Sequence, residues 1–279
     1  MPYSYRTLTE TLTRAGIEEA GEEALLLLEH FMGISRVSVM LDRDHMYTSS
    51  TLDEAVTRRL TRYPLQYILG TWNFFGCTFE VNEHCLIPRP DTEILVEEAI
   101  RILPSGARVV DLCTGSGCIA VATLYHRPDV AADALELYPD TLAIAVKNAV
   151  ANQVDERFSP IRADLLQEGL LRLTARAPYD AILSNPPYIR TADISPLSPE
   201  VHHEPFGALD GGEDGLLFYR VILRDYASLV KPGGHILLEI GYDQAADVCA
   251  LAQQFLPGSA CRVVRDLGGR DRVIIITMA

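Results

Sequence analysis

The sequence of 279 residues is poor in lysine, with only Lys147 and Lys231, and its formal net charge is −14. A protein that grips nucleic-acid phosphates needs a basic face, so this charge argues against direct nucleic-acid binding. The one compact group of cations is Arg58, Arg59 and Arg62. Arg58 and Arg62 share a face if the segment is helical, and we interpret the group as the solvated side of a helix.

Long apolar runs are also missing: none approaches the ~20 residues that span a bilayer. The first residues lack a basic segment followed by an apolar core, so no secretory signal is expected. The six cysteines show no C-x-x-C pair, and no H-E-x-x-H motif occurs. These absences predict a cytoplasmic protein with reduced thiols, no membrane partner and no metal site. We further expect a monomer.

The chain is long enough for two domains, and its pattern is helical up to residue 63. The segment "EEALLLLEHFMG" ends at Gly33, which is typical of a helix C-cap, and Thr51 with Glu54 suggests a capping box. The aromatic and β-branched segment 67–81 predicts a β-hairpin. The expected organisation is a helical domain at 1–63, a hairpin linker at 64–84 and a larger domain at 85–279.

After Gly106 the pattern alternates between strands and helices, which predicts an α/β fold with a mostly parallel sheet covered on both faces. The last two apolar runs, "CRVVRDL" and "RVIIITM", are separated only by "GGRD". A turn this short leaves no room for a crossover helix, so these strands must pair antiparallel. The expected strands are 107–113, 130–136, 157–163, 179–184 and 234–240; the expected helices are 117–126, 139–151, 214–230 and 243–255.

A glycine-rich turn follows the first of these strands in "VVDLCTGSGCIAVA". Gly115 and Gly117 let a ligand approach the backbone at a helix N-terminus, and Glu136 ends the next strand, where it can accept from ribose hydroxyls. Two cofactors compete for this turn, a dinucleotide and S-adenosylmethionine. Asp111 favours the second, because a carboxylate repels a pyrophosphate and suits an ammonium and a nearby sulfonium. Asp164 and Leu165 would lie beside the adenine, although Asp164 is also suited to cap a helix.

The segment "SNPPYI" brings Asn185 to the same edge of the sheet. Pro186 and Pro187 fix φ and lack N–H groups, so the loop presents hydrogen-bond acceptors in set directions. Tyr188 adds an aromatic face. We interpret the segment as a socket for a planar group bearing –NH₂, which suits methyl transfer to an amide or an exocyclic amine by positioning the nitrogen for attack.

Six blocks in order give a family resemblance: "PLQYILGTWNFFG", "LIPRPDTE", "DLCTGSGCIA", "SNPPYI", "EPFGALDGGEDGL" and "GGRDRV". Together they resemble the release factor glutamine methyltransferases, the PrmC or HemK family. The resemblance implies a helical N-terminal domain that recognises the substrate, a hairpin linker and a class I S-adenosylmethionine-dependent methyltransferase domain, with a seven-stranded sheet and an antiparallel final strand. The implied substrate is the glutamine of the Gly-Gly-Gln motif of class I peptide chain release factors, and the implied product of the cofactor is S-adenosylhomocysteine.

The resemblance also implies roles for single residues. Asn185 and the Pro186 carbonyl would hold the glutamine amide, with Pro187 and Tyr188 completing the catalytic loop. The cofactor-binding residues would be Asp111, Cys113, Thr114, Gly115, Ser116, Gly117, Glu136, Asp164, Leu165 and Asn185. The substrate-side wall would contain Arg89, Pro90, Thr92, Glu93 and Glu204.

Two positions depart from the family pattern: Glu136 stands where an aspartate is expected, and His203 where an aromatic residue is more usual. The alternatives are a ribosomal-protein glutamine methyltransferase, a DNA adenine N6-methyltransferase, which would have to flip its base out, and a non-catalytic S-adenosylmethionine-binding module.

Overall fold

The computed structural model describes residues 2–167 and 169–279. The chain forms two compact units, Met1–Thr71 with Ser198–His203, and Trp72–Leu197 with Glu204–Ala279. The first unit therefore reaches beyond residue 63, the expected boundary. The reason is packing, because Leu65 is buried in the core of the helical unit and Ile68 and Leu69 pack against it.

The described residues of the helical unit form five α-helices, and its core is built from Leu8, Leu12, Leu27, Leu28 and Leu52 among others. Gly33 ends α2 in the left-handed conformation with φ 64°, as expected for a C-cap. The expected capping box at Thr51 is wrong, since Ser49 caps α4 by accepting from the Leu52 N–H. The helices are α1 (Tyr5–Arg14), α2 (Ala20–Met32), α3 (Arg36–Leu41), α4 (Ser50–Leu60) and α5 (Leu65–Leu69).

The arginine cluster does not form a solvated helix face. Arg59 is only 4% exposed and donates to both oxygens of Glu23, at 2.6 and 2.9 Å, and to Glu200 at 3.0 Å. Arg62 donates to the two oxygens of Glu200 at 2.7 and 2.9 Å, while the Arg58 guanidinium lies 4.2 Å from the centre of the Tyr63 ring. Glu200 therefore fastens Ser198–His203 to the helical unit.

The hairpin is shorter than predicted, because residues 65–69 are helical. It consists of β1 (Thr71–Phe74) and β2 (Cys77–Glu80). Asn148 of α8 (Pro139–Ala151) holds β2 through both of its amide atoms: the Glu80 N–H donates to the Asn148 oxygen at 2.7 Å, and the Asn148 nitrogen donates to the Glu80 carbonyl at 3.1 Å.

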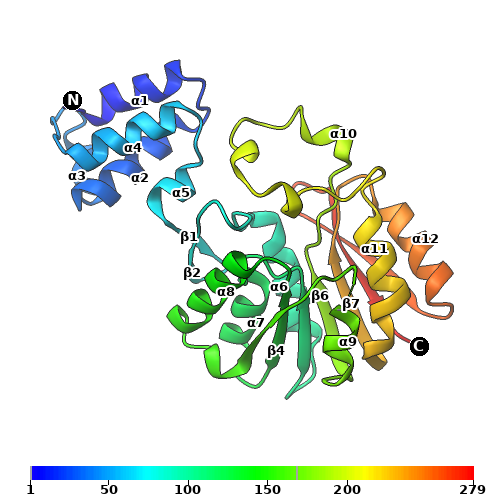
Figure 1. Ribbon diagram of the computed structural model, residues 1–279. Helices are drawn as coiled ribbons and strands as arrows, with labels where there is room; N and C mark the ends of the chain where they lie inside the picture. Colours follow the sequence, from blue (N-terminus) through cyan, green and yellow to red (C-terminus); the bar gives the residue numbers. More distant parts are fainter. Residues whose placement is uncertain (1, 168) are drawn as a thin grey trace. The chain divides into compact units, whose positions relative to one another are not determined.

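The second unit is built on a seven-stranded sheet in the order β5-β4-β3-β6-β7-β9-β8 (Figure 1). The five strands from β5 to β7 are parallel, β9 is antiparallel to β7, and β8 is antiparallel to β9. The predicted α/β fold and antiparallel pairing of the last two strands are confirmed. The strands are β3 (Arg108–Leu112), β4 (Ala131–Glu136), β5 (Phe158–Arg162), β6 (Tyr179–Ser184), β7 (Val230–Glu239), β8 (Ala260–Arg265) and β9 (Asp271–Thr277).

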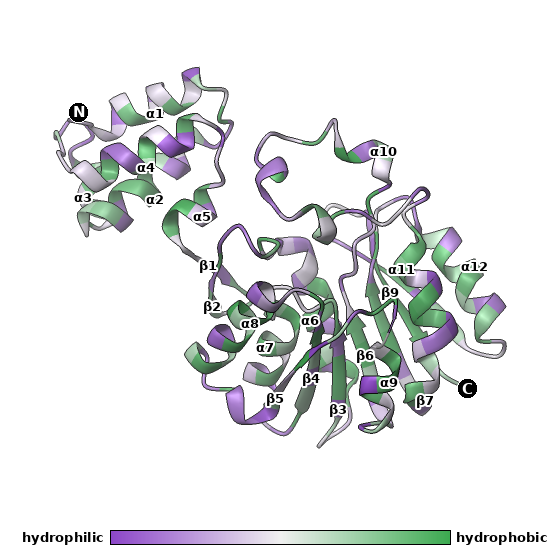
Figure 2. Ribbon diagram, viewed as in Figure 1, coloured by the Kyte–Doolittle hydropathy of each residue, from purple (hydrophilic) through white to green (hydrophobic). Residues whose placement is uncertain are grey.

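Helices cover both faces of the sheet, and the strands are correspondingly apolar on both sides (Figures 1 and 2). Val110, Ile182 and Ile236 are neighbours across β3, β6 and β7, and all three belong to the core cluster that includes Tyr219 and Val248. The expected helix at 214–230 begins only at residue 217 and continues as π and 3-10 turns. The helices of this unit are α6 (Glu93–Ile102), α7 (Cys118–His126), α8, α9 (Gly169–Thr174), α10 (Thr191–Ile194), α11 (Leu217–Val221) and α12 (Ala245–Phe255).

The prediction that all cysteines are reduced is wrong for one pair. Cys249 of α12 and Cys261 of β8 form a disulfide, and the other four cysteines keep their thiols. The sequence shows no paired cysteine motif, and it is the packing of α12 near β8 that brings these Cα atoms to 6.2 Å. No helix of the described residues is long and apolar enough to cross a membrane.

Candidate active site

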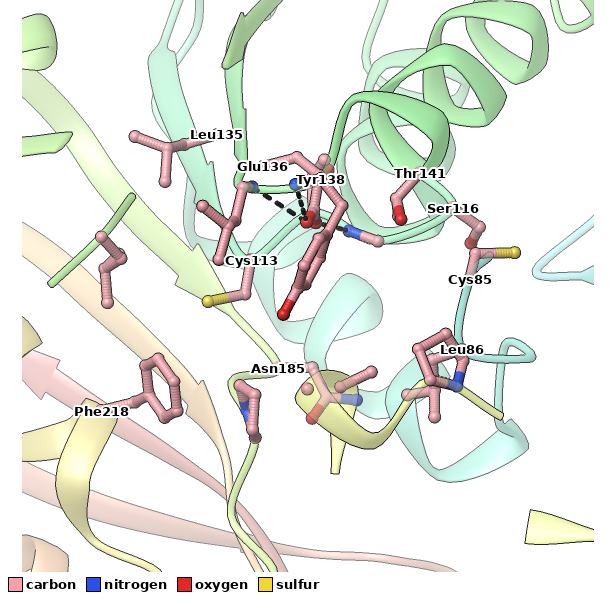
Figure 3. A pocket seen from close by; sticks show the side chains of 18 of the residues that line it. Cys85, Leu86, Cys113, Ser116, Leu135, Glu136, Tyr138, Thr141, Asn185 and Phe218 are labelled. Atoms are coloured by element: carbon pink, nitrogen blue, oxygen red, sulfur yellow. Dashed lines mark hydrogen bonds between the residues drawn. The ribbon is translucent and has the colours of Figure 1, made fainter. Parts of the chain in front are cut away.

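The candidate site lies where the strand order reverses. From β3 the chain runs outward to β4 and β5 and then returns to β6 on the other side of β3. Open α/β sheets bind ligands at the carboxyl ends of strands at such a point. The loops after β3, β4 and β6 line a cavity of about 340 Å³ there, and Figure 3 shows Glu136 and Asn185 facing it from different strands.

The turn after β3 combines three residues in the left-handed conformation: Cys113 (φ 60°), Gly115 (φ 57°) and Gly117 (φ 81°). Cys113 and Gly115 line the cavity together with Thr114 and Ser116. Gly117 does not; a Cβ there would lie 3.1 Å from the Ala145 Cβ, so the glycine permits close packing of the turn against α8.

Asp111 lies beneath this turn, fully buried, and does not reach the cavity surface. One carboxylate oxygen accepts from the Thr114 hydroxyl at 2.6 Å and from the Ala120 N–H at 3.2 Å. The other, Oδ1, is buried without a hydrogen-bond partner among the described residues. Burial raises the pKa of Asp111 to about 7, although the hydrogen bonds from Thr114 and Ala120 lower it.

Glu136 at the end of β4 organises the turns around it (Figure 3). Its Oε2 accepts from the Gly115 N–H at 3.0 Å, and its Oε1 accepts from the Leu137 and Tyr138 N–H groups at 2.9 and 3.1 Å. Burial raises the pKa of Glu136, and the three backbone donors lower it. The carboxylate lines the cavity, and its Oε2, which accepts only one of these bonds, keeps a lone pair for a ligand.

Asp164 and Leu165 follow β5 and both line the cavity. Asp164 accepts from the Leu166 N–H and the Gln167 amide, both at 2.8 Å, and these bonds shape the loop before α9. Leu165 is buried and its carbonyl accepts from the Tyr226 hydroxyl at 2.7 Å. An apolar side chain beside a carboxylate suits a purine, whose faces are apolar and whose amino group is a donor.

The loop after β6 places Asn185 and Pro187 on the cavity wall. The Asn185 Nδ2 donates to the Thr92 Oγ1 at 3.2 Å, so its oxygen Oδ1 is the acceptor left for a ligand. Pro186 is buried and, like Tyr188, lies behind the wall. Tyr188 differs from the expectation that its ring covers the ligand, since the ring packs on the main core cluster and the hydroxyl donates to the Glu239 Oε1 at 3.4 Å.

Arg89 and Thr92 of the predicted substrate-side wall also line the cavity, whereas three other members support it from behind. Glu204 is buried, forms an ion pair with Arg89 and accepts from the Ile87 N–H at 3.2 Å. Glu93 accepts from the Phe75 N–H at 2.8 Å, and Pro90 begins the 3-10 turn that leads into α6. Thr92 is the N-cap residue of α6, but its side chain makes no capping hydrogen bond.

Sequence reasoning missed part of the wall, although two of the family-like blocks contain it. Residues 84–86 approach from the segment before α6, Phe206 and Gly207 from the loop after β6, and Phe218 from α11. The blocks "LIPRPDTE" and "EPFGALDGGEDGL" contain Leu86, Phe206 and Gly207, but no local pattern distinguishes a wall residue from a supporting one. His203 makes an edge contact with Tyr63 at 5.2 Å within the helical unit.

The hydrogen bonds of the glycine turn bear on the two competing cofactors. The N–H of Gly115 is held by Glu136, that of Gly117 by the Thr114 carbonyl at 2.8 Å, and that of Thr114 by the Leu135 carbonyl at 3.0 Å. A pyrophosphate needs such N–H groups free and would meet the charge of Glu136 behind them. The carboxylate of Glu136, which lines the cavity, suits the ribose hydroxyls of S-adenosylmethionine instead. No cluster of His, Cys, Asp or Glu within the described ranges is arranged to hold a metal ion.

The chain is similar to known proteins over most of its length. Residues 5–70 match the PrmC N-terminal domain, and residues 90–198 match the methyltransferase small domain. Release factor glutamine methyltransferase of Geobacter sulfurreducens is 40% identical over 94% of this chain and 91% of its own length. The protein of the same name from Caulobacter vibrioides is 35% identical over 95% of this chain and 92% of its own.

Among solved structures, a methyltransferase from Pyrococcus furiosus has a TM-score of 0.53 at 15% identity, covering 73% of this chain and 90% of its own. That similarity supports the fold alone. The sequence relatives decide the family, because their identity extends through the helical domain and the sheet: the chain belongs to the release factor glutamine methyltransferases.

Proposed function

We propose that this protein transfers a methyl group from S-adenosylmethionine to the side-chain amide nitrogen of the glutamine in the Gly-Gly-Gln motif of class I release factors. One observation carries the proposal. The Asn185 amide is fixed by Thr92 so that its oxygen remains for a donor, and it lines the same cavity as the glycine turn and Glu136. A carboxamide held there would present its nitrogen to the cofactor.

The residues of the chain would act mainly by positioning. The Asn185 oxygen would accept one of the two amide hydrogens, and alignment of this kind can supply ~7–11 kcal/mol of a barrier. When bound, S-adenosylmethionine supplies a methyl group on a sulfonium. The N–CH₃ bond forms as the S–CH₃ bond breaks, the bonding pair stays on sulfur, and the amide proton leaves to water.

On the cofactor side, the roles follow from the donors and acceptors present. Glu136 would accept from the ribose hydroxyls, Leu165 would cover the adenine, and Asp164 would accept from its amino group. Asp111 would contribute by holding the glycine turn through Thr114 and Ala120, since its own oxygens are buried behind the cavity. Arg89, paired with the buried Glu204, would form the wall on the release-factor side.

The protein substrate is proposed to contact the helical unit as well. Helix α3 leaves two large apolar side chains in solvent, Val37 at 67% and Leu41 at 83% exposure. Replacing both by lysine should raise KM for the release factor and leave the affinity for S-adenosylmethionine unchanged. Equal effects on both would contradict this role.

The function is tested by incubating the protein with labelled S-adenosylmethionine and a purified release factor, followed by peptide mass spectrometry. We expect one methyl group on the glutamine of the Gly-Gly-Gln peptide, and Asn185→Ala should lower kcat by about 100-fold. Asn73→Ala is the matched control, since Asn73 is exposed on the hairpin, where its side-chain oxygen accepts from the Thr78 hydroxyl at 3.0 Å. Offering ribosomal proteins and duplex DNA in competition separates the alternatives: label on either, with none on the release factor, refutes the proposal.

A further inference from the structure

The residue that opens α8 is unusual for its position. Tyr138 is the N-cap residue of this helix, and its side chain makes no capping hydrogen bond. Serine, threonine, aspartate and asparagine are preferred there, because a short side-chain oxygen can accept from a backbone N–H of the first helical turn. Pro139, in contrast, suits the first helical position. A single departure from the local rule in an otherwise regular helix start points to a role outside the helix.

The side chain of Tyr138 belongs to the cavity instead. Tyr138 lines the cavity, and the residue is 48% exposed. Figure 3 shows its ring pointing into the cavity from the turn after β4. The Tyr138 N–H donates to the Glu136 Oε1 at 3.1 Å, so the residue that carries the ring is fixed to the carboxylate proposed to bind the ribose. A half-exposed aromatic ring in a cavity offers a large apolar face for a ligand to bury.

The far end of this ring lies against a glycine of another segment. A Cβ at Gly207 would lie 2.6 Å from the Tyr138 Oη and 3.3 Å from its Cε2 and Cζ atoms. Gly207 belongs to the 3-10 turn Phe206–Ala208, and its φ is not positive, so the backbone conformation does not require glycine. The three nearest atoms that a Cβ would meet all belong to Tyr138. The missing side chain at Gly207 therefore makes room for the tyrosine ring.

Other apolar side chains continue the same part of the cavity wall. Leu137, Leu166 and Phe206 all line the cavity, and all three are exposed. Exposed apolar side chains that gather around one cavity are typical of a ligand site. Glu136 accepts hydrogen bonds at this place, so the wall joins a polar acceptor to apolar surfaces. A nucleoside has the matching chemistry, with hydroxyl donors on its ribose and apolar faces on its base.

We propose that Tyr138 is a cofactor-binding residue, whose ring covers the nucleoside of S-adenosylmethionine and, resting against Gly207, retains the cofactor in the cavity. This inference rests on the cofactor of the proposed function. The ring adds contacts that exist only while the cofactor is bound, so it slows release more than entry. S-adenosylmethionine and S-adenosylhomocysteine share the nucleoside, so Tyr138 holds both equally.

The test measures the binding of both compounds to the full-length protein, with calorimetry for Kd and surface plasmon resonance for the rates. Tyr138→Ser should raise Kd for each by at least about tenfold, mainly through faster release. Tyr138→Phe keeps the ring and should keep the affinity of the wild type. Serine also supplies the missing cap, so Tyr138→Ser should melt no lower than the wild type. This separates a lost contact from a lost fold.

Gly207→Ala tests the contact without replacing Tyr138. The new Cβ displaces the ring and should also raise Kd, but adding it to Tyr138→Ser should cause no further loss, because no ring is left to displace. Tyr125→Ser is the matched control, since Tyr125 of α7 is 51% exposed and lies outside the cavity wall. Its Kd values should equal those of the wild type.

Three results would overturn the inference: wild-type affinity in Tyr138→Ser, equal acceleration of binding and release with Kd unchanged, or a loss confined to one of the two compounds. The wild type decides the proposed function separately. Failure to methylate the release-factor glutamine refutes that function, and failure to bind S-adenosylmethionine refutes both. A wild type that binds and methylates, with unchanged affinity in Tyr138→Ser, refutes the inference only.

Discussion

A substitution at Gly211 should move the catalytic loop without replacing any residue that lines the cavity. A Cβ at this position would lie 2.7 Å from the Tyr188 Cα, 2.8 Å from its carbonyl carbon and 2.9 Å from the Pro187 oxygen. All three atoms belong to the backbone of the loop, so no side chain can rotate away. The strand-like bond from the Gly211 N–H to the Ile189 carbonyl, at 2.8 Å, keeps the two segments together.

The expected size of the effect follows from these distances. Carbon atoms attract at ~3.5–4.0 Å, so relief of the shortest contact requires a shift of nearly 1 Å. Overpacking of this kind costs about 1–3 kcal/mol of the free energy of unfolding. A displacement near 1 Å of groups that align the substrate can lower kcat by about 100-fold. Gly211→Ala should therefore lose both stability and activity, with kcat affected far more than KM for S-adenosylmethionine.

Gly234→Ala is the matched control. A Cβ there meets the Val230 Cγ1 at 2.6 Å and the Asp180 carbonyl at 2.7 Å, a similar clash near the opposite end of β6 and β7. Both variants should show lower melting temperatures, but only Gly211→Ala should lose turnover when assayed well below its melting temperature. Wild-type kcat in Gly211→Ala, or an equal loss in Gly234→Ala, would refute the argument that the loop position controls the reaction.

Three further predictions concern charged groups. Arg59→Ala should lower the free energy of unfolding of the helical unit by about 3–5 kcal/mol in chemical denaturation, because Glu23 and Glu200 lose their buried partner. Arg58→Ala, on the exposed side of α4, should lower it by no more than about 1 kcal/mol. Equal losses in the two variants would contradict the role of the Arg59 ion pairs. Since the pKa of Glu239 is raised in the folded state from 4.5 to about 7, its contribution to stability is full below pH 4.5 and is lost as pH rises through 7. Glu239→Gln should therefore flatten the pH dependence of the free energy of unfolding by about 3 kcal/mol between pH 4.5 and 8, and an unchanged slope would show that the carboxylate titrates normally. Glu136→Ala frees the N–H groups of Gly115, Leu137 and Tyr138, so calorimetry should find the affinity for S-adenosylmethionine at least about tenfold lower; wild-type affinity would exclude Glu136 from the site.

Local pattern was enough to predict the elements that position the cavity. The strand 179–184 and the helix 139–151 have the predicted bounds, and the short "GGRD" connection forced the antiparallel pairing of β8 and β9. These predictions depend on the hydrophobic periodicity of a segment and on the length of the connection between two strands, which are both local properties of the sequence. The strand predicted at 67–69 is wrong, because the local pattern does not include tertiary packing. Apolar and aromatic residues fit a strand locally, but Leu65, Ile68 and Leu69 pack in the core of the first unit as part of a helix.

The cavity residues of the glycine turn, together with Glu136, Leu165 and Asn185, were identifiable from the sequence, because they end or follow strands at the carboxyl edge of the sheet. Only the tertiary structure separated Asn185 and Glu136, which reach the cavity, from Asp111, which is buried behind it. The position of Glu239 could not be found from the sequence: it ends an apolar strand and belongs to no motif, and its partner Tyr188 is distant in the chain. A sequence records which side chains are present at strand ends, but the direction of each hydrogen bond between them depends on packing across the sheet.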